Sequence, residues 1–303
     1  MPSPHRAVVL LLAALLAMVS PGCATASQPR VADYVDLSSP HPPLDGLPDS
    51  ADAVLAFALA TGSACRPSWA GERPVDDPGL HAEIAGVTAR GGHVVAATGG
   101  ESGQYLETTC GTADALAAAF GSALDATGST ELDVDLEKAV DPDRVADALT
   151  ALARRRDVAL TVTLAVDDAG FDPRVTPVLD RLAQQHVPVT VNAMLIDLDP
   201  RGDYRSTLLR TAAVAHDEVT RWPGDQLALT VMAGRNDNGA VTTLDDASAV
   251  REYALEHGVS RIGLWSFARD NGGCPTRADA SPGCSGVAQS PQAFALALSG
   301  TGP

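Results

Sequence analysis

Three carboxylates stand at alternate positions in one short stretch of the sequence. Asp133, Asp135 and Glu137 are separated by Val134 and Leu136. Successive side chains of a β-strand point to opposite faces, so the spacing predicts that the acids share one face and the apolar residues the other. Burying such acids is costly unless they are paired, protonated or coordinated. The pattern therefore predicts that the chemistry of this protein is centred on these three carboxyls.

Two other interpretations use the same residues. An edge strand with an acidic solvent face would have this spacing, and a calcium site would also use carboxylates. Calcium sites take their ligands from a turn, and three carboxylates along a straight strand lack that geometry. The histidines show no ligand spacing either. We therefore expect no metal and no cofactor.

The elements that must position these acids alternate along the chain between two patterns. Helical spacing of apolar residues predicts helices over 141–155 and 244–257, with Asp141 and Thr243 as N-caps and Gly258 after the second helix. Eight apolar runs have the length and composition of strands, and they span Tyr34–Leu37, Ala53–Ala60, His93–Thr98, Glu131–Glu137, Ala159–Val166, Pro188–Ile196, Gln226–Ala233 and Arg261–Ser266.

Eight strands with helices between most of them predict an α/β fold, a single (β/α)8 barrel of the TIM type. A doubly wound open sheet is the alternative, but it has a glycine-rich phosphate loop after an early strand. The nearest segment, 99–103, fits neither the dinucleotide nor the P-loop fingerprint. In a barrel the apolar face of 131–137 must pack on the helices, so the three acids would line the interior near its C-terminal mouth. Long loops are expected over 66–77 and 270–286.

The N-terminus has the pattern of an export signal. A short basic start precedes the apolar run 7–19, which predicts a signal peptide over 1–22, a linker over 23–32 and the barrel domain over 33–300. Cys23 ends a sequence that resembles a bacterial lipobox, while 24–26 offers an ordinary small-x-small cleavage site. We expect an extracellular protein or one anchored to the cell surface by lipid on Cys23.

The remaining cysteines predict two disulfides. Five cysteines is an odd number for an exported protein, and setting Cys23 aside leaves four that can pair. Cys274 with Cys284 closes a small loop, so Cys65 and Cys110 form the other pair. Zinc is the competing interpretation, but these spacings are not those of a zinc site. Disulfides fit an oxidising compartment better.

Composition narrows the partners. The formal net charge of −17 argues against nucleic acid and against an anionic membrane surface. Aromatic residues make up only 4% of the chain, which disfavours a long stacking track for a crystalline polymer. We expect a monomer.

The acidic strand resembles the DxxDxDxE strand of glycoside hydrolase family 18, the chitinases and their relatives, with Thr130 in place of the outermost aspartate. The resemblance covers nearly the whole mature chain. Further segments that resemble the family, in order, are Tyr34-Val35-Asp36 at the first strand, Cys65 to Gly71 after the second, Ala97-Thr98-Gly99-Gly100 at the SxGG strand, Met194-Leu195-Ile196-Asp197 at the MxYD position, and Gly234 to Asp237 and Leu264 to Asp270 at the last two strands.

The resemblance implies retaining hydrolysis of β-1,4-linked N-acetylglucosamine glycans, such as chitin or chitooligosaccharides, with the substrate's own acetamido group as nucleophile. Glu137 would be the general acid and then the general base. Asp135 would orient the acetamido N–H, and Asp133 would share a proton with Asp135. The substrate site would also contain Trp265 as a floor and Asp197 as a polar wall, together with Met194, Gly99 and Gly100.

Several residues depart from the family pattern. Ile196 replaces the tyrosine that would bind the acetamido oxygen, Ala97 replaces the serine of SxGG, and Lys138 follows the acid. Tyr204 is a candidate for supplying the missing hydroxyl. The alternatives are an endo-β-N-acetylglucosaminidase acting on other glycans, or a lipid-tethered glycan-binding protein with lost or weak catalysis. Trp69 and Trp222 have two interpretations, either as platforms for sugar rings or as packing residues.

Overall fold

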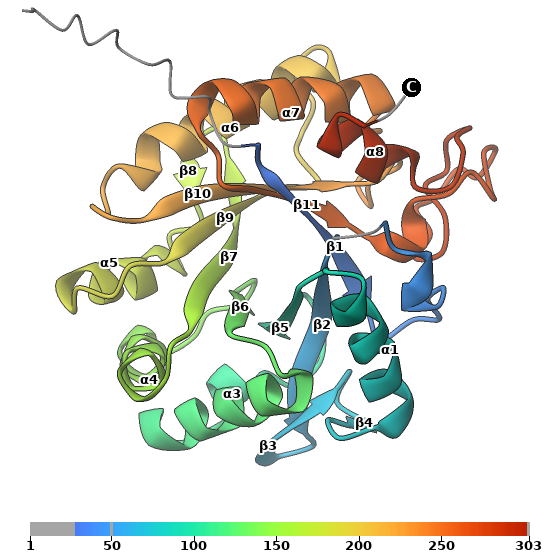
Figure 1. Ribbon diagram of the computed structural model, residues 1–303. Helices are drawn as coiled ribbons and strands as arrows, with labels where there is room; N and C mark the ends of the chain where they lie inside the picture. The colour runs from blue at the N-terminus through green and yellow to red at the C-terminus, as the bar shows by residue number, and fades with distance from the viewer. Residues whose placement is uncertain (1–27, 49–50, 302–303) are drawn as a thin grey trace, which may run out of the picture.

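The computed structural model describes residues 28–48 and 51–301, and in it eight parallel strands close into a barrel (Figure 1). Each strand pairs with the next one along the chain, and the last pairs with the first, so that Trp265 lies opposite Tyr34. The predicted (β/α)8 fold is confirmed. The barrel strands are β1 (Arg30–Asp36), β2 (Asp52–Thr61), β5 (Val94–Gly99), β6 (Glu131–Asp135), β7 (Ala159–Asp167), β9 (Thr190–Leu195), β10 (Gln226–Met232) and β11 (Arg261–Trp265).

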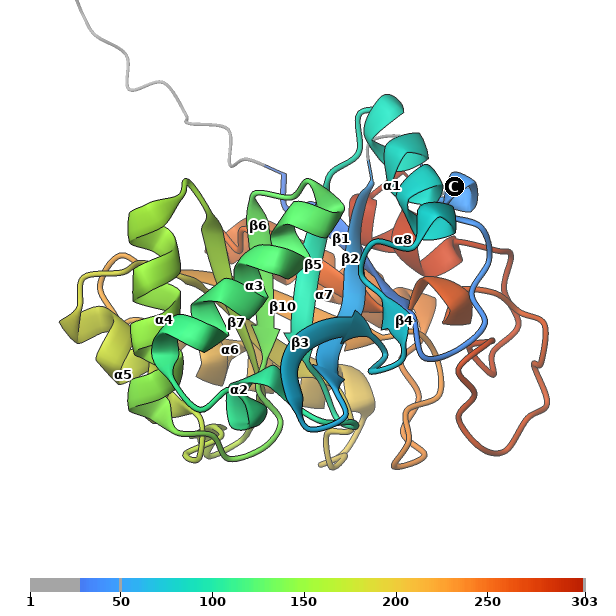
Figure 2. The ribbon, with the colours of Figure 1, turned by 90° about the horizontal axis from the view of Figure 1, so that it is seen from below.

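Helices surround the barrel (Figures 1 and 2). The described residues between β1 and β2 form one short 3-10 helix, η1 (Leu44–Gly46), and another, η2 (Phe267–Arg269), follows β11. The α-helices are α1 (Pro78–Ala89), α2 (Leu106–Thr109), α3 (Ala113–Thr127), α4 (Pro142–Arg155), α5 (Thr176–Gln184), α6 (Tyr204–Val219), α7 (Leu244–His257) and α8 (Ala293–Ser299).

The two helices whose ends were predicted begin and end as expected. Asp141 accepts a hydrogen bond from Arg144 N at the start of α4. Thr243 forms a capping box with Asp246 at the start of α7, and Gly258 follows that helix with a φ of 69°. Local side-chain chemistry therefore sets these boundaries.

Two separate apolar layers form because the strands alternate. Leu132, Val134 and Leu136 belong to the large core between the strands and the helices. The interior of the barrel holds a much smaller apolar cluster, in which Tyr34 lies among alanines and valines. The opposite face of β6, which carries the acids, therefore points into the barrel, as predicted.

The segment 66–77 was predicted to be a loop, and this prediction was wrong. Its first part belongs to β3 (Ala64–Trp69), which pairs antiparallel with β2, and β4 (Arg73–Pro74) pairs with β3 in turn. Prolines are tolerated here because the hairpin is at the edge of the sheet. A second small hairpin is formed by β8 (Gly170–Phe171) with the end of β7.

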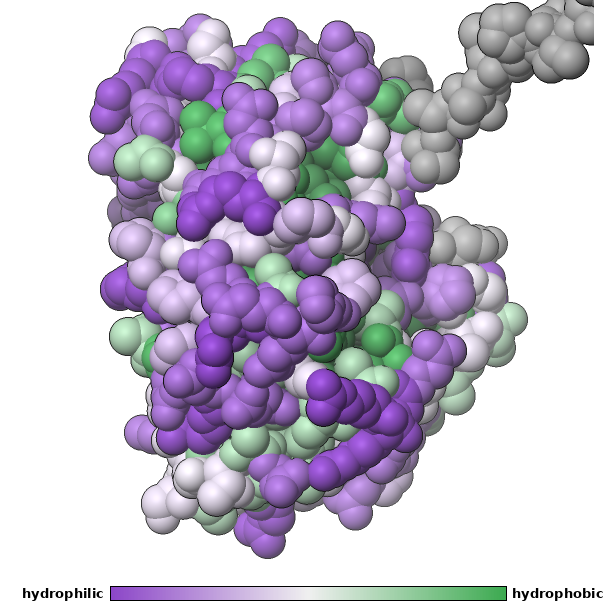
Figure 3. Space-filling model, turned by 90° about the vertical axis from the view of Figure 1, so that its left-hand side faces the viewer, coloured by the Kyte–Doolittle hydropathy of each residue, from purple (hydrophilic) through white to green (hydrophobic). Residues whose placement is uncertain are grey.

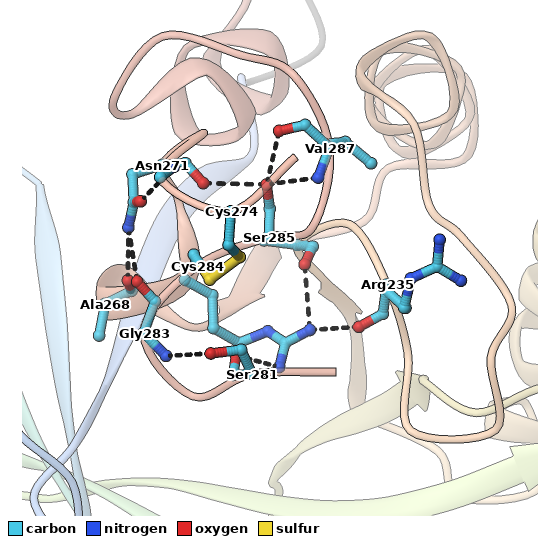
Figure 4. Close-up of a disulfide and its surroundings, with 12 residues drawn as sticks. Arg235, Ala268, Asn271, Cys274, Ser281, Gly283, Cys284, Ser285 and Val287 are labelled. Carbon is cyan, nitrogen blue, oxygen red and sulfur yellow. Dashed lines mark hydrogen bonds between the residues drawn. A yellow bond between two sulfur atoms is a disulfide. The ribbon is translucent and has the colours of Figure 1, made fainter. Parts of the chain in front are cut away.

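The segment 270–286 contains no helix or strand, only an isolated bridge between Ser281 and Cys284. The Cys274–Cys284 disulfide closes it, and side chains fix it from inside (Figure 4). The Asn271 amide donates to the carbonyl of Ala268 and to that of a glycine across the loop. Arg235 N donates to the carbonyl of Ser285 at 2.7 Å, which ties the loop to the end of β10.

The second predicted disulfide is also present, and Cys65–Cys110 joins β3 to the residue that follows α2.

The predicted signal peptide and Cys23 lie outside the described residues. Strand β1 begins at Arg30, inside the range predicted as a linker. No helix in the described ranges is long and apolar enough to cross a membrane. The face on the left of Figure 1, near α4 and α5, is mostly hydrophilic with scattered apolar patches (Figure 3).

Candidate active site

The three acids of the β6 segment are stacked from the middle of the barrel towards its mouth. Asp133 is fully buried and Asp135 is 4% exposed. Glu137 lies two residues past the end of β6 and is partly exposed. The carboxyl ends of barrel strands are where active sites form in this fold, so Glu137 is placed where a substrate can reach it.

Hydroxyl groups hold the innermost acid. The Tyr34 hydroxyl donates to Asp133 Oδ2 at 2.5 Å, and Thr163 Oγ1 donates to Asp133 Oδ1 at 2.7 Å. Asn192 Nδ2 donates to both of these hydroxyl oxygens. Burial raises the pKa of Asp133, while nearby Arg261 and the two hydroxyls oppose that rise. Asp133, at the base of the stack, is therefore held in place by two hydroxyl hydrogen-bond donors.

Asp135 has fewer hydrogen-bond partners than Asp133. Its Oδ1 is buried and has no hydrogen-bond partner among the described residues. Burial raises the pKa of Asp135 well above its ordinary value, and the charges of Glu137, Asp133 and Glu107 raise it further. Both effects favour the protonated form of Asp135. No hydrogen bond joins it to Asp133 in the described chain, so the coupling of the two acids is electrostatic, and the shared proton stays a prediction.

Glu137 titrates near neutrality. Burial raises the pKa of Glu137 to about 7, with Glu101 and Asp197 raising it and Lys138 lowering it. A carboxyl with such a pKa is populated in both protonation states at neutral pH, which suits a group that first gives and then takes a proton.

Two adjoining hollows open beside Glu137. The inner one has a volume of about 140 Å³, and an aromatic floor forms its base, where Trp265 stacks on Phe57 with ring centroids 5.9 Å apart. The outer one has a volume of about 660 Å³ and lies over the ends of β7 and β9. Both are lined by Glu137, Met194, Ile196 and Asp197. The inner one is also lined by Tyr34, Phe57, Glu101, Asp135, Thr163, Thr230, Met232, Asp237 and Trp265.

Trp265, Asp197 and Met194, predicted to contact substrate, therefore line the cavity, whereas Gly99 and Gly100 do not. A Cβ on Gly99 would lie 1.8 Å from the backbone oxygen of Asp135, and one on Gly100 would lie 2.5 Å from the Phe57 ring. Both glycines also have φ near +90°. Their role in this structure is to let β5 and β6 approach and to leave room for the floor. Contact with a substrate stays a prediction.

Ile196 faces the cavity where the family pattern has tyrosine, and Tyr204 does not replace it. The Tyr204 hydroxyl donates to Asn236 Oδ1 at 3.3 Å, and the same oxygen accepts from Asp197 N. Tyr204 is absent from the lining of both hollows. Of the described tyrosines, Tyr34 lines the inner hollow, and its hydroxyl is already engaged.

Sequence reasoning missed several groups at the site. Glu101 follows directly after the two glycines at the end of β5, and the rule that function gathers at the C-terminal strand ends could have found it. Phe57 had no signal within its long apolar run. Trp69 and Trp222 are both buried and pack inside the protein rather than at the cavity. No group of three or more potential ligands among the described residues is arranged to hold a metal ion.

A closed (β/α)8 barrel that presents acid–base carboxyls at its mouth defines a class of protein, the glycoside hydrolases with a TIM-type barrel. The comparisons agree with that class. A domain of a thermostable chitinase from Pyrococcus furiosus, solved with chito-oligosaccharides, is 27% identical with a TM-score of 0.80, covering 90% of this chain and 94% of that one. The catalytic domain of a hyperthermophilic chitinase from the same organism is 29% identical with a TM-score of 0.79 over the same shares.

A curated relative points in the same direction. The probable bifunctional chitinase/lysozyme of Escherichia coli (strain K12) is 24% identical over 279 residues, which cover 79% of this chain. The chain spans only 30% of the length of that protein. No protein-family model matches the chain. The fold is therefore that of family 18 chitinases.

Proposed function

We propose that this protein hydrolyses β-1,4-linked N-acetylglucosamine glycans, such as chitin or chitooligosaccharides, with retention of configuration and with the substrate's acetamido group as nucleophile. One observation carries the proposal: Glu137, a carboxyl whose pKa is raised to about 7, stands at the barrel mouth above the buried Asp135, whose pKa is also raised. The likeness to chitinases that bind chito-oligosaccharides supports the choice of substrate.

The reaction has two steps. Glu137 donates its proton to the glycosidic oxygen as the bond to the anomeric carbon breaks, and the acetamido carbonyl oxygen bonds to that carbon, giving an oxazolinium ion. The leaving sugar departs with the proton. In the second step the Glu137 carboxylate takes a proton from water, the water oxygen bonds to the anomeric carbon, and the oxazolinium ring opens to restore the acetamide.

The other cavity residues support the intermediate. Asp135, with a buried Oδ1 that has no partner in the described chain, is available to the acetamido N–H once a substrate enters. A proton shared by the two aspartates would then move towards Asp133, which already accepts hydrogen bonds from two hydroxyls. Trp265 would lie beneath the sugar ring. Asp197 would contact the acetamide from the side.

Ile196 predicts slow turnover. The cavity wall beside Met194 offers a methyl group where a hydroxyl would stabilise the acetamido oxygen. The loss of one donor at a developing charge costs about 100-fold to 1,000-fold in kcat in comparable sites. This feature favours a second candidate, a glycan-binding protein with weak or lost catalysis. The intact Glu137 and Asp135 favour the enzyme.

The test is hydrolysis of a fluorogenic chitotrioside by the wild type, by Glu137→Gln and by Glu131→Gln. Glu131 is the matched control because it lies on the same strand at the opposite end, paired with Arg30. Turnover in the wild type and in Glu131→Gln but not in Glu137→Gln would support the proposal. Binding of N-acetylglucosamine oligomers without turnover would replace it with the binding protein. Glycoprotein glycans would test the endo-β-N-acetylglucosaminidase alternative.

We also propose that the protein is exported, with lipid on Cys23 as an anchor. The basis is the sequence pattern alone. Intact mass of the protein made in a bacterial host would show a diacylglyceryl increment on a chain that begins at Cys23. A chain cleaved after residue 26, without added mass, would contradict the anchor.

A further inference from the structure

Glu137 stands where the backbone hydrogen bonds of the barrel end. Leu136 N still donates to the carbonyl of Thr163 on β7, at 2.8 Å. One residue later, Glu137 N donates instead to a side chain, the hydroxyl of Tyr105, at 3.2 Å. The strand itself stops at Asp135. The backbone that carries the proposed acid is therefore held by Tyr105 and not by the sheet.

The same hydroxyl is fixed on its other side. It donates to the carbonyl of Gly100, which follows β5, and the Tyr105 side chain is 2% exposed. Gly100 N in turn donates to the carbonyl of Asp135 at 2.9 Å. One buried phenol thus joins the ends of β5 and β6 at the barrel mouth. Its two hydrogen bonds fix the direction in which the chain leaves Asp135.

Tyr105 is itself tethered. It directly precedes α2, and Cys110 directly follows that helix and is bonded to Cys65 of β3. Within α2, Glu107 accepts a hydrogen bond from Thr98 Oγ1 of β5 at 2.5 Å. A four-residue helix would not hold its position unaided. The disulfide and the Glu107 contact hold it against the barrel.

Lys138 completes the arrangement. Its ammonium lies 4.6 Å from the centre of the Tyr105 ring and donates to the carbonyl of Gly103. The residue after the acid therefore covers the phenol, and the chain on both sides of Glu137 is in contact with Tyr105 or its neighbours. This accounts for a lysine at a position where the family pattern has a small residue.

We propose that Tyr105 is a positioning residue for Glu137, which it holds in line with the glycosidic oxygen through the Glu137 backbone. The proposal rests on the proposed function of Glu137 and extends it to a residue that does not line the cavity. Proton transfer is sensitive to placement, and a displacement of about 1 Å can cost about 100-fold in rate. Substrate contacts are made by other residues, so binding should change little.

The experiment compares Tyr105→Phe with Tyr253→Phe in the full chain. Tyr253 is the matched control because it lies on α7, away from the cavity lining, and its hydroxyl has no partner in the described chain. Tyr105→Phe should lower kcat by about 10-fold to 100-fold with KM changed less than about 2-fold. The alkaline limb of its pH profile should move to lower pH, because a loosened Glu137 is better hydrated. Tyr253→Phe should match the wild type in kcat, in KM and in the alkaline limb of the pH profile.

A kcat and a pH limb equal to those of the wild type would overturn the proposal, as would a change in KM alone. If Tyr105→Phe does not fold, the double variant Cys65→Ser/Cys110→Ser, which frees α2 and keeps the phenol, must shift kcat and the limb in the same direction. If the wild type hydrolyses no probe, the proposed function fails. Tyr105 is then tested without substrate, by ¹³C NMR titration of labelled glutamate assigned with Glu137→Gln. If Glu137 titrates at the same pH in Tyr105→Phe as in the wild type, the proposal for Tyr105 is overturned.

Discussion

The Tyr34 hydroxyl donates a 2.5 Å hydrogen bond to Asp133 Oδ2 across the centre of the barrel, and the two residues are 99 positions apart in the chain. The bond links the first strand of the barrel to the strand that carries the acids. It also provides the innermost carboxyl with a donor that favours its charged form. The stack above it depends on this contact.

Removing that donor should weaken both stability and turnover. Tyr34→Phe leaves Asp133 Oδ2 buried without its donor, which costs about 1–3 kcal/mol. It also raises the pKa of Asp133 further, so that this residue takes up a proton more readily, and it releases one of the two hydroxyl contacts that fix the carboxyl beneath Asp135. We expect a lower free energy of unfolding in urea and a lower kcat. Unchanged stability would show that water replaces the hydroxyl.

Activity should decline above neutrality. The acid must be protonated, and its pKa is raised to about 7 by burial and by the charge of Glu101. Above that pH, kcat/KM should fall about 10-fold per unit. Glu101→Gln removes a negative charge, which lowers the pKa of Glu137, so the alkaline limb should move to lower pH. Glu131→Gln, outside the cavity, should leave the limb in place. An identical limb in all three proteins would contradict this assignment.

Stability should fall between acid and mildly alkaline pH because of Asp33. This carboxyl is buried on β1, neither oxygen has a partner in the described chain, and burial raises its pKa from 3.8 to about 8. The folded state thus binds a proton that the unfolded state has lost, and the stabilisation present at low pH disappears as pH rises through about 8. Asp33→Asn should gain roughly 2–4 kcal/mol over the wild type between pH 5 and pH 8.

Urea unfolding of both proteins at each pH measures that gain directly. Other titrating groups, such as Glu107, occur in both proteins and cancel in the difference. The relevant quantity is the difference in the free energy of unfolding between Asp33→Asn and the wild type. If this difference does not increase with pH, Asp33 is ionised in the folded protein.

The charge of the cleft predicts a preference among glycans. Acids line both hollows, and Arg201, which lines the outer hollow, is paired with Asp168 at 3.1 Å. Oligomers with some free amino groups should therefore be hydrolysed faster than fully acetylated ones at low salt, and glycans that carry N-acetylmuramic acid more slowly. The preference should shrink from about 20 mM to about 500 mM salt as the charges are screened. A ratio of kcat/KM values that does not depend on salt would exclude electrostatic selection.

The barrel could be predicted because its signals are local. The eight strands are short apolar runs separated by helical spacing, and Asp141, Thr243 and Gly258 mark helix ends by their own side-chain chemistry. The alternation of Asp133 and Asp135 with apolar neighbours gave the direction in which the acids point. Each of these inferences uses residues within a few positions of one another, so one sequence is enough to make them.

The parts of the site that sequence reasoning missed depend on distant partners. Tyr105 meets Glu137 from 32 positions away, and Tyr34 meets Asn192 from 158. Tyr34 lies in a segment that resembles the family, but nothing near either tyrosine in the sequence indicates the partner of its hydroxyl. The β3–β4 hairpin was missed for another reason, since its prolines and glycine are typical of loops and only the edge of β2 makes the segment a strand.

The closure of the barrel through β1 fixes how the molecule faces its surroundings. Strand β1 is hydrogen bonded on both sides, to β2 and β11, and begins at the end of the barrel opposite Glu137. In Figure 2, β5 and β6 run downward to the mouth of the barrel, while β1 begins near the top, at the opposite end. An attachment through the N-terminus would therefore hold the protein by its base, with the cleft directed outward from whatever surface bears it. Long polymers could then approach freely, and the anchoring surface would not block their path.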